Sequence, residues 1–140
     1  MRRSDQRRLA VFALYQHDQT GRELEDIFDN DTPEFSRELA EQTLADRDRI
    51  DEVIVAHTTG SWPLSRIAPL ERNIMRVTIN ELYNRDDVPR EVAVDEAVEL
   101  AKNYCSADAP KFVNGILGAV LRGMPALVDD GEETADDGQS

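Results

Sequence analysis

Apolar residues recur at helical spacing along most of this chain, and no stretch alternates between apolar and polar residues over a convincing length. A period near 3.6 residues places side chains on one face of a helix, whereas a strand needs a period of two. Only seven glycines and six prolines interrupt the 140 residues, so long regular elements are expected. The pattern therefore predicts an all-α fold.

Cap residues and helix breakers set the expected boundaries of these helices. Ser4 is a favourable N-cap for the first helix, which Gly21 ends. Thr32 is the expected cap of the second, with Pro33 at its first position. Tyr104 falls on the apolar face of the helix that precedes the last one. The predicted segments are residues 5–17, 32–58, 70–85 and 91–104, a short turn at 64–67, and a last helix that begins after Ser106 or Asp108.

Composition bounds the organisation of the chain. Hydrophobic residues make up 40% of it but aromatic residues only 6%, which suits a helical core of Leu, Ile, Val and Ala. Residues 1–125 are expected to form a single domain. Residues 126–140 are acidic and poor in large apolar groups, which predicts a disordered tail. No apolar run approaches a membrane span and no secretory signal is recognisable, so we expect a cytoplasmic protein without membrane contact.

No arrangement of residues typical of catalysis or metal binding is present. His17 and His57 lack a partner at metal-ligand spacing, and Cys105 is the only cysteine. Neither a phosphate-binding glycine loop nor a dinucleotide-binding glycine motif occurs. The sequence predicts a protein that is not an enzyme and needs neither cofactor nor metal.

Charge alone argues against nucleic-acid binding, because the formal net charge is -13 and binders usually carry a basic patch. The positive charge is nevertheless concentrated. Residues 1–8 contain four arginines and one acid, and the only two lysines are Lys102 and Lys111. Arginine forks suit phosphates and stack on unpaired bases, so a local cationic strip on an acidic body is a candidate RNA site.

A second candidate site is the run Lys111-Phe112-Val113-Asn114-Gly115. It offers a cation for phosphate, a ring for stacking on a base and an amide for a base edge. Structural alternatives remain open for three of its residues. Phe112 fits a core position, Asn114 fits a buried amide that ties two helices together, and Gly115 fits a close helix approach.

Three regions in order carry a family resemblance: residues 7–16, the segment that begins at Leu70, and residues 89–117. Residues 89–102 fit P-x-x-V-A-[IV]-[ND]-E-A-[VI]-E-L-A-K, and residues 111–117 fit K-F-V-N-G-[IV]-L. Upstream, the match includes residues 7–16 and the segment that begins Leu-Glu-Arg-Asn-Ile-Met-Arg at Leu70. Together these segments resemble the NusB family of bacterial transcription antitermination factors, over roughly residues 2–123.

The resemblance implies a fold of two small antiparallel helical bundles with about six to seven helices. It also implies binding of boxA, a single-stranded RNA, together with the ribosomal protein NusE, in the RNA polymerase antitermination complex during ribosomal-RNA transcription. The implied RNA contacts are Arg2, Arg3, Arg7, Arg8, Tyr15, Lys102, Lys111, Phe112 and Asn114. The implied contacts with the protein partner are Glu71, Arg72 and Arg76.

Two departures from the family pattern bear on RNA affinity. Ser4-Asp5-Gln6 interrupts the arginine run, and Asp95 stands where the family usually has asparagine. We therefore expect weak, salt-sensitive RNA binding that tightens when the partner is present. The alternative is an RNA-independent helical scaffold of the same fold that binds only proteins. Homodimer formation through the same helical surface is left open.

Overall fold

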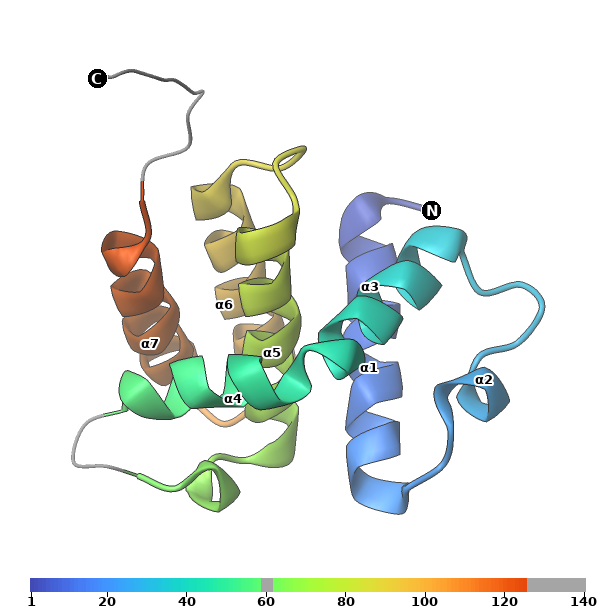
Figure 1. Cartoon of the computed structure of the whole chain (residues 1–140), viewed down its shortest axis with the longest axis horizontal. Helices are drawn as coiled ribbons and strands as arrows, with labels where there is room; N and C mark the ends of the chain where they lie inside the picture. The colour runs from blue at the N-terminus through green and yellow to red at the C-terminus, as the bar shows by residue number, and fades with distance from the viewer. Residues whose placement is uncertain (59–61, 126–140) are drawn as a thin grey trace.

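The computed structural model describes residues 1–58 and 62–125, and within these residues all regular structure is helical (Figure 1). The helices are α1 (Arg3–Thr20), α2 (Leu24–Ile27), α3 (Glu34–Ala45), α4 (Arg47–Ala56), the 3-10 turn η1 (Leu64–Arg66), α5 (Pro69–Asn84), α6 (Arg90–Tyr104) and α7 (Ala109–Gly123). The predicted all-α class is confirmed. The predicted disordered tail, residues 126–140, lies outside the described residues.

The helices form two groups that meet along α5 (Figure 1). In the first group α1 packs against α3, with α2 beside α1. In the second, α5, α6 and α7 alternate in direction and α4 crosses α5. Helix α5 contacts both groups and is buried continuously from Asn73 to Leu82. The arrangement agrees with the two helical bundles that the family resemblance implied.

The first helix differs from its predicted bounds at both ends. It begins at Arg3, so Ser4 lies inside the helix, and Arg2 occupies the N-cap position without a side-chain cap bond. It continues to Thr20 and ends, as predicted, at Gly21. Gly21 has φ of 76°, a left-handed conformation that glycine adopts without steric cost, and its N–H donates to the carbonyl of His17.

The predicted helix over residues 32–58 is wrong in one respect: it is two helices. The break falls at Asp46, whose φ of -104° and ψ of 11° lie outside the helical range. The chain turns there because α3 packs against α1 whereas α4 packs against α5. Thr32 is not the cap of α3; its hydroxyl instead accepts a hydrogen bond from the N–H of Asp29 at 3.1 Å.

Polar residues inside the fold join the two groups of helices. Asp18 of α1 accepts hydrogen bonds from Arg72, Asn73 and Arg76 of α5. Arg76 also donates to both carboxylate oxygens of Asp51 on α4, at 2.7 and 2.8 Å. Three helices are therefore tied together by one charged network. No helix among the described residues is long and apolar enough to cross a membrane.

Candidate nucleic-acid interface

A cleft of about 280 Å³ lies where the first turns of α1 meet the last turns of α6. We call it the arginine cleft. Its lining includes Arg2, Asp5, Arg8, Glu96, Asn103 and Tyr104. The structure thus brings two of the four predicted N-terminal arginines together with a carboxylate-rich rim, an aromatic ring and an amide.

Arg2 and Arg8 are held in the cleft by weak surface contacts, which are ion pairs with Asp5 and, for Arg8, a long hydrogen bond to the hydroxyl of Tyr104. Each lies near Asp5, with nitrogen-to-oxygen distances of 3.4 Å for Arg2 and 3.3 Å for Arg8. Their side chains are 82% and 38% exposed. Exposed pairs of this kind contribute about 0–1 kcal/mol, so a phosphate can displace Asp5 without a large loss of stability.

Arg7 is buried and paired inside the fold, which argues against its predicted role as an RNA contact. It is 2% exposed. Its Nε and Nη2 donate to the two carboxylate oxygens of Glu81, each at 2.7 Å, and its Nη1 donates to Glu96. Burial lowers the pKa of Arg7, but the hydrogen bonds and charge of Glu81 and Glu96 outweigh burial and raise the pKa overall. No nitrogen that could bind phosphate faces solvent.

Arg3 is directed away from the arginine cleft. Its guanidinium lies 3.9 Å from the ring centroid of Phe35 on α3, and Arg85 lies over the same ring at 4.8 Å. Its Nη1 donates to Asp87 at 3.3 Å. The predicted strip of four arginines is therefore split: Arg2 and Arg8 share one cleft, Arg3 lies on another face, and Arg7 is inside.

Helix α7 separates the predicted contacts Phe112 and Asn114. Successive helical residues are rotated by about 100°, so these two side chains leave the helix about 200° apart, on opposite flanks. Phe112 is half-buried, and its ring centroid is 6.1 Å from that of Trp62. Asn114 is exposed, so the buried-amide alternative is wrong. A Cβ at Gly115 would meet nothing within 4 Å, so close helix approach does not explain that glycine either.

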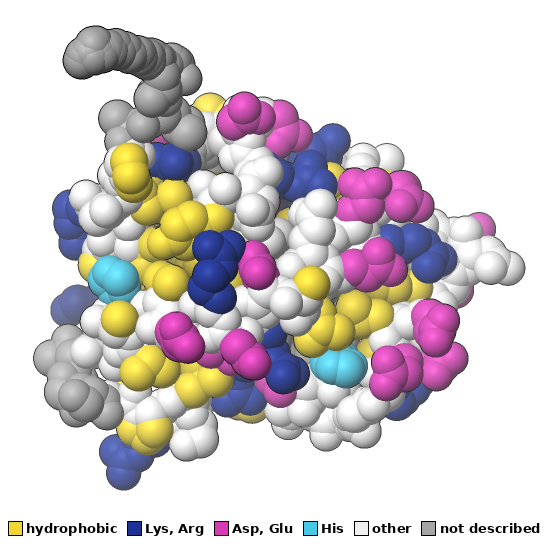
Figure 2. Space-filling model, in the orientation of Figure 1, with side chains coloured by type: hydrophobic (Ala, Val, Ile, Leu, Met, Phe, Trp, Pro, Cys, Tyr) yellow, Lys and Arg dark blue, Asp and Glu magenta, His cyan; other side chains and the backbone are white. Residues whose placement is uncertain are grey.

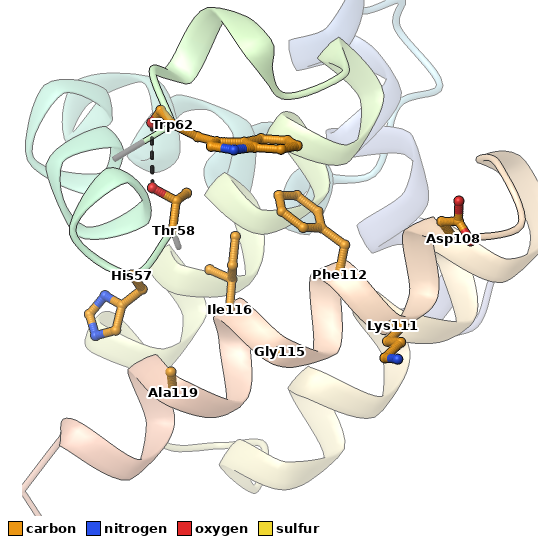
Figure 3. A pocket seen from close by; sticks show the side chains of 9 residues that line it. All are labelled: His57, Thr58, Trp62, Asp108, Lys111, Phe112, Gly115, Ile116 and Ala119. Atoms are coloured by element: carbon orange, nitrogen blue, oxygen red, sulfur yellow. Dashed lines mark hydrogen bonds between the residues drawn. The ribbon is translucent and has the colours of Figure 1, made fainter. Parts of the chain in front are cut away.

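Phe112 and Lys111 line a second, more apolar groove between the end of α4 and α7, which we call the apolar groove. This groove has a volume of about 780 Å³ and also includes Trp62, Ile116 and Ala119 (Figure 3). In Figure 3 the rings of Trp62 and Phe112 lie close together, whereas Lys111 extends to the other side of α7. Neither Lys111 nor Lys102 lines the arginine cleft, although both side chains are exposed.

Tyr15 lies on the same side of α1 as Arg8. Seven residues separate the two, which is close to two helical turns. Its side chain is exposed and lies farther along the helix than the arginine cleft, whose lining does not include it.

The predicted partner contacts on α5 mostly face inward. Arg72 and Arg76 belong to the network around Asp18. Burial raises the pKa of Asp18, but the hydrogen bonds from Arg72 and Asn73, together with the charge of Arg76, lower it overall. Glu71 is half-buried, and burial raises its pKa. Glu71 lines a surface pocket, and Arg76 lines a small hollow beside Asp18. The guanidinium groups of Arg72 and Arg76 already donate to Asp18 and Asp51, so they have no free group to offer a partner.

Of the lining residues of the arginine cleft that sequence reasoning missed, Asn103 and Tyr104 supply an amide and an aromatic ring. Tyr104 was expected on the apolar face of its helix, yet its side chain is 45% exposed. Its place as the last residue of α6 was the available signal, because helix ends often leave the covered part of a bundle. Among the described residues no group of three or more potential metal ligands occurs.

Comparison with known proteins gives consistent matches over nearly the whole chain. The model of the NusB family matches residues 4–122. The transcription antitermination protein NusB of Symbiobacterium thermophilum is 37% identical, over 98% of this chain and all of that protein. The corresponding protein of Rubrobacter xylanophilus is 35% identical, over 94% of this chain and 99% of that protein.

Solved structures agree with this assignment of the fold. NusB from T. maritima superposes with a TM-score of 0.78 at 30% identity, covering 88% of this chain and 92% of that chain. A crystal structure of the antitermination factors NusB and NusE in complex with dsRNA matches with a TM-score of 0.74 at 26% identity, covering 87% and 97%. These relatives are transcription factors, which confirms the prediction that the chain is not an enzyme.

Proposed function

The chain belongs to the NusB family, and on that premise we propose that it is a transcription antitermination factor. In this proposal it binds boxA-type single-stranded RNA together with the ribosomal protein NusE, within the RNA polymerase complex that transcribes ribosomal RNA. The observation that carries the proposal is the arginine cleft. Arg2 and Arg8 are held there by surface pairs with Asp5 and, for Arg8, by a long hydrogen bond to Tyr104.

The chemistry of the cleft suits RNA better than a protein surface. Guanidinium groups bind phosphate through two parallel hydrogen bonds and stack on unpaired bases. Of the other predicted contacts, Tyr15, Lys102 and Lys111 have exposed side chains and stay in the proposal as contacts beyond the cleft. Phe112 and Asn114 leave α7 on opposite flanks, so they contact different parts of a ligand. Arg7 is left out because it is buried.

The net charge of -13 explains why a partner is needed. Figure 2 shows acidic and basic side chains interspersed on the face it displays, without a large basic field. A basic partner supplies positive potential near the RNA and is attracted to the acidic helices. We therefore propose that NusE binds this protein first and that the pair binds RNA more tightly than this protein alone.

The proposal is tested by fluorescence anisotropy with a labelled boxA RNA and a scrambled RNA, each titrated with and without NusE. We expect selective binding of boxA that tightens with NusE and weakens in Arg8→Ala. Arg22→Ala is the matched control, since Arg22 lies beyond the other end of α1. Equal, weak binding of both RNAs under all conditions would overturn the proposal.

A second candidate is the RNA-independent protein scaffold. It is favoured by the acids that line the arginine cleft, Asp5, Glu96 and Glu99, and by the burial of Arg7. The same titration separates the two functions. Binding of NusE without any gain in RNA affinity is the result that the scaffold predicts.

A further inference from the structure

An aromatic ring stands at the surface of the arginine cleft without a covering element. Tyr104 ends α6 and is 45% exposed, whereas Val94, Ala97 and Ala101 on the same helix are buried. Exposed aromatic rings lose apolar contact with the core, so a ring held at the surface beside two arginines calls for an explanation.

The ring is held in a fixed orientation from two sides. On one side, the ring of Tyr104 makes an edge-to-face contact with the ring of Phe12. The two ring planes are nearly perpendicular, at 89°, and the ring centroids are 5.1 Å apart. Phe12 itself packs against the hydrophobic core. Arg8 Nη1 donates to the hydroxyl of Tyr104 at 3.4 Å, a long hydrogen bond. A side chain ordered in this way before binding loses little entropy when a ligand arrives.

The neighbouring residue supplies an amide beside the ring. Asn103 lines the same cleft and is exposed. Its Nδ2 donates to Glu99 at 3.5 Å, which is at the limit of a hydrogen bond and leaves the amide free to exchange partners. An amide offers both donors and an acceptor, which is the combination that the edge of a nucleobase requires.

We infer that Tyr104 is the stacking platform for one unpaired base of the bound RNA and that Asn103 hydrogen-bonds to the edge of that base. This inference rests on the proposed function and adds to it the place where a base, rather than a phosphate, is recognised. Arg2 and Arg8 bind the backbone next to the stacked base. The role explains why the ring is exposed and why the arginine nearest to it bonds to its hydroxyl.

The size and shape of the cleft favour an unpaired nucleotide. A volume of about 280 Å³ is close to the lower end of small-ligand pockets, which suits one nucleoside. Stacking on an aromatic face is also open only to a base that has left its own helix. An acidic protein segment is the competing occupant, since its carboxylates would also pair with the two guanidinium groups, and the test below separates it from RNA.

The test uses the full chain with NusE and a set of boxA RNAs, each carrying 2-aminopurine at one position. The variants are Tyr104→Leu, which removes the ring, and Tyr104→Phe, which keeps the ring and loses the hydroxyl. Tyr83→Leu is the matched control, because Tyr83 is 43% exposed and also lies near an arginine, Arg49, outside the cleft. Urea unfolding of each variant shows that the fold is retained.

We expect fluorescence quenching at one RNA position in the wild type, lost in Tyr104→Leu together with about tenfold in affinity. Tyr104→Phe keeps the quenching, and Tyr83→Leu keeps both properties. Unchanged affinity and quenching in Tyr104→Leu would overturn the inference while leaving RNA binding intact. Loss of NusE binding with unchanged RNA affinity would overturn it too, since the ring would then serve the protein partner. If the wild type binds no RNA, the proposed function itself fails.

Discussion

Arg7 and Arg8 are neighbours in the sequence with opposite surroundings. A rotation of about 100° along α1 turns Arg7 toward Glu81 and Glu96 and leaves Arg8 at the cleft. Composition cannot tell the two apart, because the partners of Arg7 lie 74 and 89 residues away. The same side chain therefore serves the core at position 7 and lies at the surface, open to a ligand, at position 8.

Substitutions of Arg7 and Arg8 should differ in their effect on the free energy of unfolding. Arg7→Met leaves Glu81 buried without its partner, which we expect to cost about 3–5 kcal/mol. Arg8→Ala removes a surface pair with Asp5 and a long, exposed hydrogen bond to Tyr104, and should cost less than about 1 kcal/mol. Urea unfolding at pH 7 measures both. Similar losses of stability in the two variants would contradict the assigned roles.

Asp18 gives the protein an acid-sensitive contact. Its pKa in the folded state is lowered by its partners on α5, so between that value and the unfolded value of about 3.9 the unfolded chain binds more protons. The free energy of unfolding therefore rises with pH through this window, and the contribution of Asp18 is lost as the pH falls through its folded pKa.

Asp18→Asn should cost about 2 kcal/mol at pH 7 and flatten the loss of stability on acidification. Urea midpoints between pH 2.5 and pH 7 measure this, at steps of about half a unit around the usual carboxylate pKa. Asp48→Asn is the control, because its carboxylate is 91% exposed and its substitution should leave the pH dependence as it is. Equal pH profiles for wild type and Asp18→Asn would contradict the role of the network.

At the scale of elements, the sequence was most informative where caps and apolar spacing coincide. The bounds of α5 and α6 differ from their predicted ends by one residue or none. The break at Asp46 escaped prediction because it follows from packing against two different helices, and α2 escaped because four residues carry no period. The opposite flanks of Phe112 and Asn114, by contrast, follow from helical geometry alone.

Replacing two glycines by alanine should change the stability of the protein in opposite directions. Gly21 follows the last residue of α1, and Gly115 lies inside α7. Gly21→Ala places a Cβ in a left-handed turn and should destabilise by about 1–2 kcal/mol. Gly115→Ala meets no neighbour within 4 Å inside α7 and should stabilise by about 0.5–1 kcal/mol. Thermal unfolding followed by circular dichroism measures both shifts, and a destabilised Gly115→Ala would show that the exposed flank of α7 is not free.

At the scale of the whole molecule, an acidic body presents a small cleft in which two arginines lie among three carboxylates. The charged network of α1, α4 and α5 fixes the two helix groups relative to each other, and the cleft lies across another contact of α1 with the second group. This geometry could not be obtained from the sequence, because it depends on how α1 packs on the second group. Weak RNA binding by the chain alone, which composition and the interrupted arginine run predict, stays a prediction.

The salt dependence of RNA affinity reports how many RNA phosphates the protein neutralises. With Arg2, Arg8, Lys102 and Lys111 as the phosphate contacts, the logarithm of RNA affinity should fall with the logarithm of salt concentration at a slope of about -2.8. Arg8→Ala should reduce the slope to about -2.1, and NusE should steepen it. Anisotropy titrations at four salt concentrations give these slopes; an unchanged slope in Arg8→Ala would place the phosphates elsewhere.

The central claim, that RNA lies across the arginine cleft, is tested most directly by mapping amide chemical shifts in the NMR spectrum of the labelled protein with NusE as boxA RNA is added. The account predicts that the largest shifts fall on residues 2–8 and 99–104, with residues 45–49 at the α3–α4 break unmoved. Shifts confined to the apolar groove around Trp62 and Ile116, with Arg8 and Tyr104 unmoved, would contradict it.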